Sequence, residues 1–99
     1  MNLKTRKKDR VLVVEPEGPR LDVQSVPAFK QAALERLEHG ALLVMDLQQV
    51  QFIDSTGLGA LLSLLRRTRE LEGRMVLAHA SDQILAMFRL VKMTRIFDL

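Results

Sequence analysis

The sequence predicts an α/β fold, as one domain over residues 1–99, with a small mixed sheet of about four strands packed with three or more helices. Short apolar runs at residues 11–14, 41–47 and 75–78 alternate with stretches whose apolar residues recur at helical spacing. Strands that alternate with helices are joined by crossover connections, which are nearly always right-handed. The length of 99 residues, with 47% hydrophobic and 27% charged side chains, also suits a single globular domain.

The first predicted strand covers residues 11–14, because Val-Leu-Val-Val is rich in β-branched side chains. Pro16, Gly18 and Pro19 follow it and indicate a turn. Residues 20–22 form a brief second strand in this interpretation.

The first predicted helix begins near Ser25 and stops at Gly40. Ser25 suits the N-cap, and Pro27 falls in the first turn, where a missing N–H costs nothing. The apolar residues at helical spacing are Val26, Phe29, Ala33, Leu34 and Leu37. This pattern indicates an amphipathic helix.

Residues 41–47 are apolar without alternation, which is typical of a central strand covered on both faces. A second helix is predicted after Gly57, with a stop at Gly73. Its apolar face would consist of Leu58, Leu61, Leu62 and Leu65.

The C-terminal third predicts a strand at residues 75–78, then a helix capped by Ser81 or Asp82. That helix would carry Ile84, Leu85, Phe88 and Leu90 or Val91. Ile96-Phe97 is a candidate last strand.

Composition excludes several function classes. The chain has no Cys, so disulfides, thiolate metal sites and Cys catalysis are excluded, and a reducing compartment suits it. It shows no signal peptide and no apolar stretch long enough for a membrane helix, so we expect a cytoplasmic protein without a membrane partner. Without Trp or Tyr it offers no aromatic platform for stacking bases, and no phosphate loop, dinucleotide fingerprint or metal-ligand cluster points to a cofactor.

The net charge of +3 comes from the N-terminus, where the first ten residues hold five Lys or Arg against one Asp. A basic segment on a nearly neutral body is typical of a solvated tail or of an edge strand that discourages edge pairing. A surface for nucleic acid or anionic lipid is the alternative interpretation.

The most informative segment is Phe52-Ile53-Asp54-Ser55-Thr56-Gly57-Leu58-Gly59. It joins an apolar strand to a helix, where free backbone N–H groups meet the positive end of the helix dipole. We expect Ser55 at that N-terminus, with Gly57 and Gly59 leaving room for another protein to approach its hydroxyl. The simpler interpretation is that Ser55 or Thr56 caps the helix and the glycines permit a tight turn.

This segment resembles the signature of the STAS family, the bacterial anti-sigma factor antagonists. Gly18 followed by Leu21-Asp22, with a helix from Ser25, is similar to that family's early strand-turn-helix, although Pro19 and Arg20 depart from its Gly-Glu-Leu-Asp-like run.

The resemblance implies a STAS-type fold and a partner-switching protein that is not an enzyme. It implies that a partner anti-sigma factor serine kinase phosphorylates Ser55 and that a metal-dependent Ser/Thr phosphatase removes the phosphate. The unphosphorylated protein would bind the anti-sigma factor and free the sigma factor. The implied partner-binding residues are Asp22, Asp54, Ser55, Thr56, Gly57, Leu58 and Gly59.

Three alternatives stand beside this interpretation. A serine hydrolase would use Ser55 with His39 or His79, but the Gly-x-Ser-x-Gly elbow is missing because Ile53 lies two residues before Ser55. A STAS-type subunit of a lipid-transport or other signalling complex would use the same helix surface without sigma control. A DNA-binding protein would use the arginines at 66, 67 and 69, although Glu70 and Glu72 share that helix end.

Overall fold

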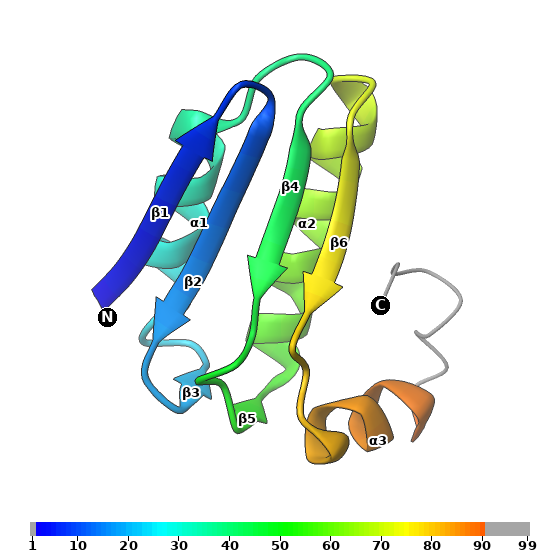
Figure 1. The fold of residues 1–99 in the computed structure, drawn as a ribbon. Helices are drawn as coiled ribbons and strands as arrows, with labels where there is room; N and C mark the ends of the chain where they lie inside the picture. Colours follow the sequence, from blue (N-terminus) through cyan, green and yellow to red (C-terminus); the bar gives the residue numbers. More distant parts are fainter. Residues whose placement is uncertain (1, 91–99) are drawn as a thin grey trace.

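The computed structural model describes residues 2–90 and confirms the predicted α/β class. One four-stranded sheet has the order β1-β2-β4-β6 (Figure 1). Its strands are β1 (Asn2–Lys8), β2 (Val11–Glu17), β4 (Leu42–Asp46) and β6 (Arg74–Ala78). β1 runs antiparallel to β2, whereas β2, β4 and β6 are parallel. The sheet is therefore mixed, with the basic segment as its edge strand.

Two very short strands, β3 (Arg20–Leu21) and β5 (Phe52–Ile53), form a separate parallel pair beyond the end of the main sheet (Figure 1). The described helices are α1 (Val26–Arg36), α2 (Ser55–Glu70) and α3 (Asp82–Leu90). α1 and α2 both lie on one face of the sheet. The two crossover connections, β2-α1-β4 and β4-α2-β6, have the same handedness and advance in the same direction across the sheet, so their helices lie on the same face.

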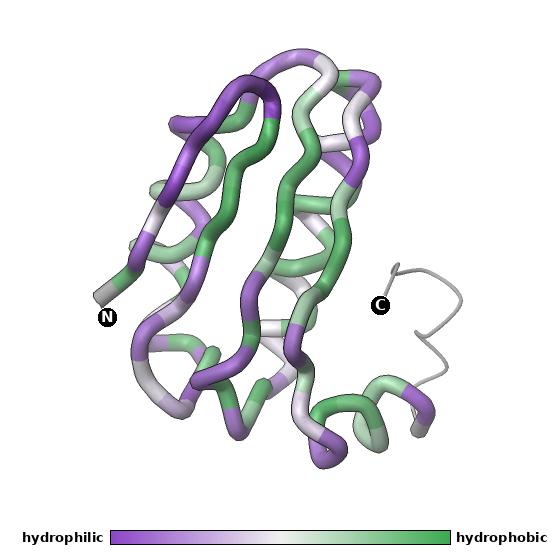
Figure 2. Tube along the Cα trace, in the orientation of Figure 1, coloured by the Kyte–Doolittle hydropathy of each residue, from purple (hydrophilic) through white to green (hydrophobic). Residues whose placement is uncertain are grey.

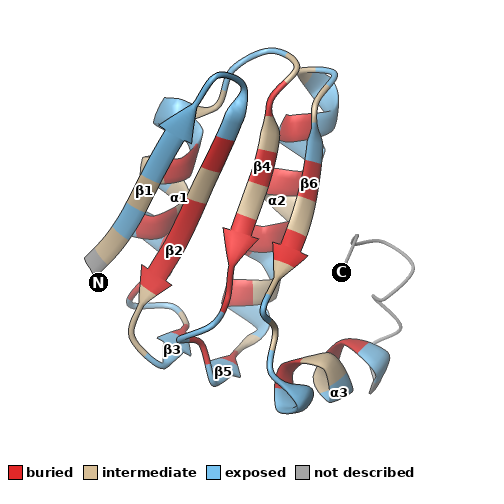
Figure 3. Cartoon of the chain, viewed as in Figure 1, coloured by how far each residue is buried: buried red, intermediate tan, exposed pale blue. Residues whose placement is uncertain are grey.

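The core lies between that face and the two helices. Successive side chains of each strand point to opposite faces of the sheet, and residues paired across strands point to the same face. Hydrophobic and buried residues recur along the strands in Figures 2 and 3. The fully buried residues here include Leu12, Val14, Leu43, Met45, Phe29, Ala33, Leu61 and Leu64. Burial of each large side chain contributes roughly 1.5–3 kcal/mol to stability.

The expectation that residues 41–47 are covered on both faces is wrong. Leu42 and Val44 alternate with the buried Leu43 and Met45 and are only half-buried, and no described helix lies over their side of the sheet (Figure 1). Apolar side chains on this side are shielded in part by their neighbours across the strands. A run without polar alternation therefore does not require a helix on each face.

Helix ends differ from the predicted stops. α1 ends at Arg36 because Leu37 is extended (φ −74°, ψ 131°), and Gly40, with φ +74°, makes the turn into β4 instead. α2 ends at Glu70, and Gly73 is needed for a close contact, since a Cβ there would lie 2.4 Å from the carbonyl oxygen of Ala41.

The third helix is confirmed, and the Ser81 hydroxyl accepts a hydrogen bond from the Ile84 N–H at 3.2 Å. Val91 and the candidate strand Ile96-Phe97 lie outside the described residues. None of the helices within residues 2–90 combines the length and the apolar character that crossing a membrane demands.

Candidate functional site

The N-terminus of α2 is capped by Asp54. This residue is extended (φ −93°, ψ −175°), and its Oδ1 accepts a hydrogen bond from the Gly57 N–H at 2.9 Å. The interpretation in which Ser55 or Thr56 caps the helix is therefore wrong, because both already lie within its first turn. Ser55 and Thr56 are exposed. With Asp54 as the cap, the Ser55 hydroxyl is left at the surface of the first turn.

The two glycines of the segment have different roles. Gly57 is buried against β3, and a Cβ there would lie 2.3 Å from the Leu21 carbonyl oxygen and 2.7 Å from Ile53 Cγ2. Gly59 is exposed, and a Cβ there would meet nothing within 4 Å. Gly57 thus serves packing inside the protein, whereas Gly59 alone fits the expectation of an open approach to the helix. Leu58, between them, packs against the core.

Asp22 reaches the same region through the pairing of β3 with β5. Leu21 pairs with Ile53, and the Asp54 N–H donates to the Leu21 carbonyl oxygen at 3.3 Å. Asp22 and Asp54 each follow the end of one of these paired strands. The structure therefore brings Asp22 to the same end of the molecule as the residues from Asp54 to Gly59, as the resemblance implied.

Hydrogen bonds hold the Asp22 carboxylate in the turn before α1. Its Oδ1 accepts from the N–H groups of Gln24 and Ser25 at 3.1 and 3.3 Å, and its Oδ2 accepts from Arg20 Nε at 3.2 Å. Burial opposes ionisation, but the Arg20 guanidinium and the backbone N–H groups outweigh it, so the pKa of Asp22 lies below its usual value.

Ser25 stands at the N-cap of α1 but makes no capping hydrogen bond. Its hydroxyl instead accepts from the Asp22 N–H at 2.9 Å and donates to the Arg20 carbonyl oxygen at 3.2 Å. The predicted N-cap position is confirmed, but the hydroxyl does not cap the helix, because it is engaged by the Asp22 N–H and the Arg20 carbonyl oxygen. Ser25 links the turn to β3 and so helps to position Asp22.

An exposed aromatic ring lies next to this region, and the sequence alone did not single it out. Phe52 precedes Ile53 and Asp54, and 42% of its surface is exposed. The Arg20 guanidinium carbon lies 4.3 Å from the centre of the ring. Val23, in the turn after Asp22, is 64% exposed. Exposed apolar side chains beside a polar cluster are typical of protein-binding surfaces, and the isolated Phe before the motif was the available signal.

The histidines do not form a catalytic group with Ser55. His79 Nδ1 lies 3.1 Å from Asp46 Oδ1, and His39 Nε2 lies 3.1 Å from Glu72 Oε2. Within residues 2–90, no hydrogen bond joins the Ser55 hydroxyl to another side chain, and no three His, Asp or Glu side chains gather to hold a metal ion. The chemistry of a hydrolase therefore has no support at this serine.

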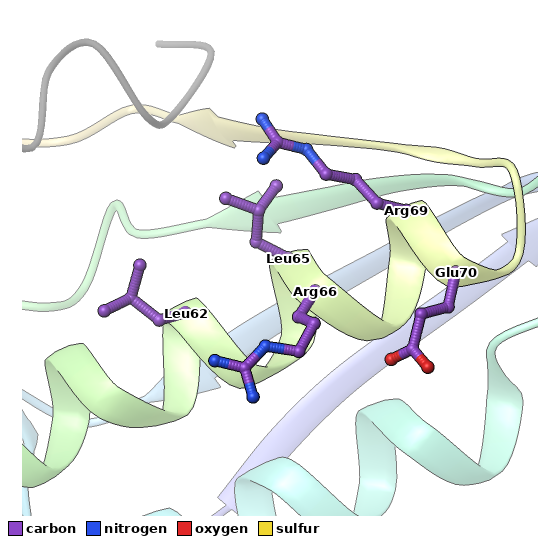
Figure 4. A pocket seen from close by; sticks show the side chains of 5 residues that line it. All are labelled: Leu62, Leu65, Arg66, Arg69 and Glu70. Atoms are coloured by element: carbon purple, nitrogen blue, oxygen red, sulfur yellow. The ribbon is translucent and has the colours of Figure 1, made fainter.

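The arginines of α2 lie farther along the helix. Arg66 and Arg69 line a pocket of about 510 Å³ together with Leu62, Leu65 and Glu70 (Figure 4). Arg67 lies 4.0 Å from Glu70. Leu62 follows Ser55 by about 10 Å along the helix axis at 1.5 Å per residue. The pocket is therefore separate from the α2 N-terminus, and an acidic residue interrupts the cationic surface that the DNA-binding interpretation required.

The profile of the STAS domain family matches residues 2–99. The chain belongs to the STAS domain family. It is 28% identical over 80 residues to the anti-sigma-B factor antagonist of Listeria monocytogenes, covering 80% of this chain and 70% of the relative. It is 25% identical to the anti-sigma-B factor antagonist of Bacillus subtilis over all 99 residues, covering 90% of that protein. The predicted resemblance is confirmed.

Solved structures share the fold of this STAS domain. An anti-sigma factor antagonist domain protein from Planctomyces limnophilus matches 97% of the chain, which covers 86% of that protein, with a TM-score of 0.84 and 17% identity. Unphosphorylated SpoIIAA matches 90% of the chain, which covers 83% of SpoIIAA, with a TM-score of 0.68 and 19% identity. The murine anion transporter Slc26a9 contains the fold in 14% of its length and matches 86% of this chain, with a TM-score of 0.72 and 20% identity.

Proposed function

We propose that this STAS domain protein is an anti-sigma factor antagonist that is switched by phosphorylation of Ser55. A partner anti-sigma factor serine kinase would add the phosphate, and a metal-dependent Ser/Thr phosphatase would remove it. The main support for this proposal is that Ser55 is exposed in the first turn of α2, next to the N-cap Asp54. The relatives of the chain are anti-sigma-B factor antagonists, which fits the same role.

The unphosphorylated protein docks through the surface around that turn. We assign to it Asp22, Asp54, Ser55, Thr56, Leu58 and Gly59, with Gly57 buried beneath them, and we add the exposed Phe52 and Val23. The apolar side chains supply area to bury, and the carboxylates and hydroxyls supply hydrogen bonds at its rim. Binding of the anti-sigma factor to this surface would release the sigma factor.

Phosphate on Ser55 would change the charge of the surface more than its shape. A phosphoryl group adds roughly −1.5 to −2 charges at neutral pH. The helix N-terminus favours that charge, but the Gly57 N–H is already bonded to Asp54, whose neighbouring carboxylate repels the phosphate. The anion therefore stays at the docking surface. A coupling of about 3 kcal/mol would weaken partner binding about 150-fold.

Phosphate transfer from ATP tests the proposal. The purified chain is incubated with ATP and the anti-sigma factor kinase of its own cell, and the product is examined by intact mass and peptide mass spectrometry. We expect one phosphate on Ser55, none on Ser55→Ala, and unchanged transfer to Thr56→Ala. Phosphate on another residue, or none on any, contradicts the site assignment. A partner that binds Ser55→Asp as tightly as the unmodified chain supports a permanent subunit instead.

A further inference from the structure

The face of the sheet opposite α1 and α2 forms two rows of side chains across the strands. Arg6, Val13, Val44 and Val76 are paired in one row. Lys8, Val11, Leu42 and Arg74 are paired in the next. Side chains that pair across strands share a face, so the first row runs from Arg6 onto apolar side chains of β2, β4 and β6. The second row runs from Lys8 over Val11 and Leu42 to another cation, Arg74, on β6.

The cations at the β1 end of these rows are not neutralised. Arg6 and Lys8 are exposed, and within residues 2–90 neither has an ion-pair partner. Lys4, the next cation on this face, lies 4.0 Å from Glu17. Lys7, which alternates with them, points to the other side and bonds to Glu38 after α1. The hydropathy colours in Figure 2 show β1 as hydrophilic beside the hydrophobic β2.

The carboxylates Glu15 and Asp46 lie at the far end of the same face and are already engaged. Both are buried. Glu15 Oε2 accepts from the side-chain amides of Gln48 and Gln49 at 2.8 Å each, and Asp46 lies 3.1 Å from His79. Glu15 pairs with Lys4 across β1 and β2, so both anions lie beyond Arg6 toward the other end of the strands, farthest from Lys8.

We propose that this face binds an acidic amphipathic segment of a partner protein. The cationic sheet face, defined as Arg6, Lys8, Val11, Val13 and Val44, would receive apolar side chains on its valines and carboxylates on its two cations. A pocket of about 300 Å³ lined by Arg6, Lys7, Lys8, Val11 and Val13 lies where charge and apolar surface meet. Its size suits one or two side chains of such a segment.

Charge and shape favour this occupant over three others. Nucleic acid would find two free cations beside an apolar row, which offers nothing to phosphates or bases. A membrane is bound through large apolar side chains that insert below the headgroups, whereas this face offers short valine side chains that project little from the sheet. In a face-to-face contact, a second copy of the chain would bring no free carboxylate to Arg6 and Lys8, because the carboxylates of that face are engaged.

The test uses the full chain and a designed 18-residue helical peptide with a leucine stripe flanked on one side by glutamates. Binding is followed by fluorescence anisotropy and mapped by backbone amide NMR. We expect the shifted amides to lie in β1, β2 and β4, and affinity to fall as salt rises. The variant Arg6→Glu/Lys8→Glu should bind about tenfold weaker or worse, since two charge pairs are reversed.

Matched variants separate this proposal from non-specific attraction. Arg66→Glu/Arg67→Glu makes the same change in net charge on α2 and should bind as the unmodified chain does. Val13→Thr keeps the shape of the side chain and its charge, and should weaken binding by removing apolar contact. Amide shifts at α2 instead of β1, or equal loss in both charge variants, overturn the proposal. So does tighter binding to anionic lipid vesicles than to the peptide, or a dimer in sedimentation that Arg6→Glu/Lys8→Glu disrupts.

Discussion

The Asp54 carboxylate accepts a hydrogen bond from the backbone N–H of Gly57 at 2.9 Å, and this bond decides what each residue of the motif does. Asp54 satisfies one of the free N–H groups of α2, so Ser55 is not needed as a cap. Its hydroxyl is exposed at the first turn, beside Thr56. A residue that the fold does not use is available for modification by a partner.

Replacing Asp54 tests the cap. Asp54→Ala should lower the free energy of unfolding by about 1 kcal/mol, because the Gly57 N–H loses its acceptor. Asp54→Asn keeps an acceptor oxygen at the same position and should stay within a few tenths of a kcal/mol of the unmodified chain. Urea unfolding followed by circular dichroism measures both. Equal destabilisation by the two variants would show that the charge, and not the hydrogen bond, matters.

The two glycines of the motif should respond in opposite directions to alanine. Gly57→Ala places a Cβ against the Leu21 carbonyl oxygen and should destabilise the protein by about 2 kcal/mol, the usual cost of overpacking. Gly59→Ala meets open space and should stabilise α2 by up to about 1 kcal/mol. Denaturant midpoints of the pair provide the comparison. A Gly57→Ala variant as stable as Gly59→Ala would contradict the close packing of α2 on β3.

Charge at Ser55 should control partner binding under the proposed function. Ser55→Ala should bind the anti-sigma factor as the unmodified chain does, and Ser55→Asp should bind at least about tenfold weaker. Ser55→Asn has nearly the same size as Asp without its charge, so it separates bulk from electrostatics. Isothermal titration calorimetry at low and high salt gives the affinities. Weakening by Asn as strong as by Asp would assign the effect to bulk.

Phe52 should contribute to the same interface. Phe52→Ala removes an exposed ring and should weaken binding about tenfold while changing stability little, because interface energy concentrates in aromatic anchors. Leu34→Ala is the control, since Leu34 is a similarly exposed apolar residue on α1. The same titration detects the difference. Equal affinities of the two variants would remove Phe52 from the docking surface.

Acid stability should depend on Glu15. Hydrogen bonds from Gln49 and Gln48 lower the pKa of Glu15 below its ordinary value of 4.5. A lowered pKa in the folded state means stability that is present above pH 4.5 and is lost as the pH falls through the folded-state pKa. Glu15→Gln removes this titration, so its unfolding free energy should fall less steeply with acid. Urea midpoints taken from pH 6 downward for both chains test this, and parallel curves would contradict it.

Local patterns predicted most elements, because β-branched runs and helical spacing report on short-range geometry. They were less reliable at helix termini, although the Ser81 cap of α3 was predicted. Asp54, Ser55 and Thr56 all have side chains that can cap α2, and only the backbone conformation decides which one does. Gly57 was predicted to leave room for a partner at Ser55. The structure shows instead that glycine is needed there because the carbonyl oxygen of Leu21, distant in the sequence, leaves no space for a Cβ.

The sequence by itself determined the α/β class, the basic N-terminal segment and the serine beside a helix start, since composition, hydrophobic period and a compact motif carry this information. Only the structure showed that the basic segment is the edge strand β1 and that Ser55 is exposed. Only the tertiary structure decided that β3 pairs with β5, which brings Asp22 and Phe52 to the turn at Ser55. It also decided that one face of the sheet has no described helix over it. Both features depend on how segments distant in the sequence pack together. The free energy of such contacts depends on both segments, so no local stretch of sequence reveals it.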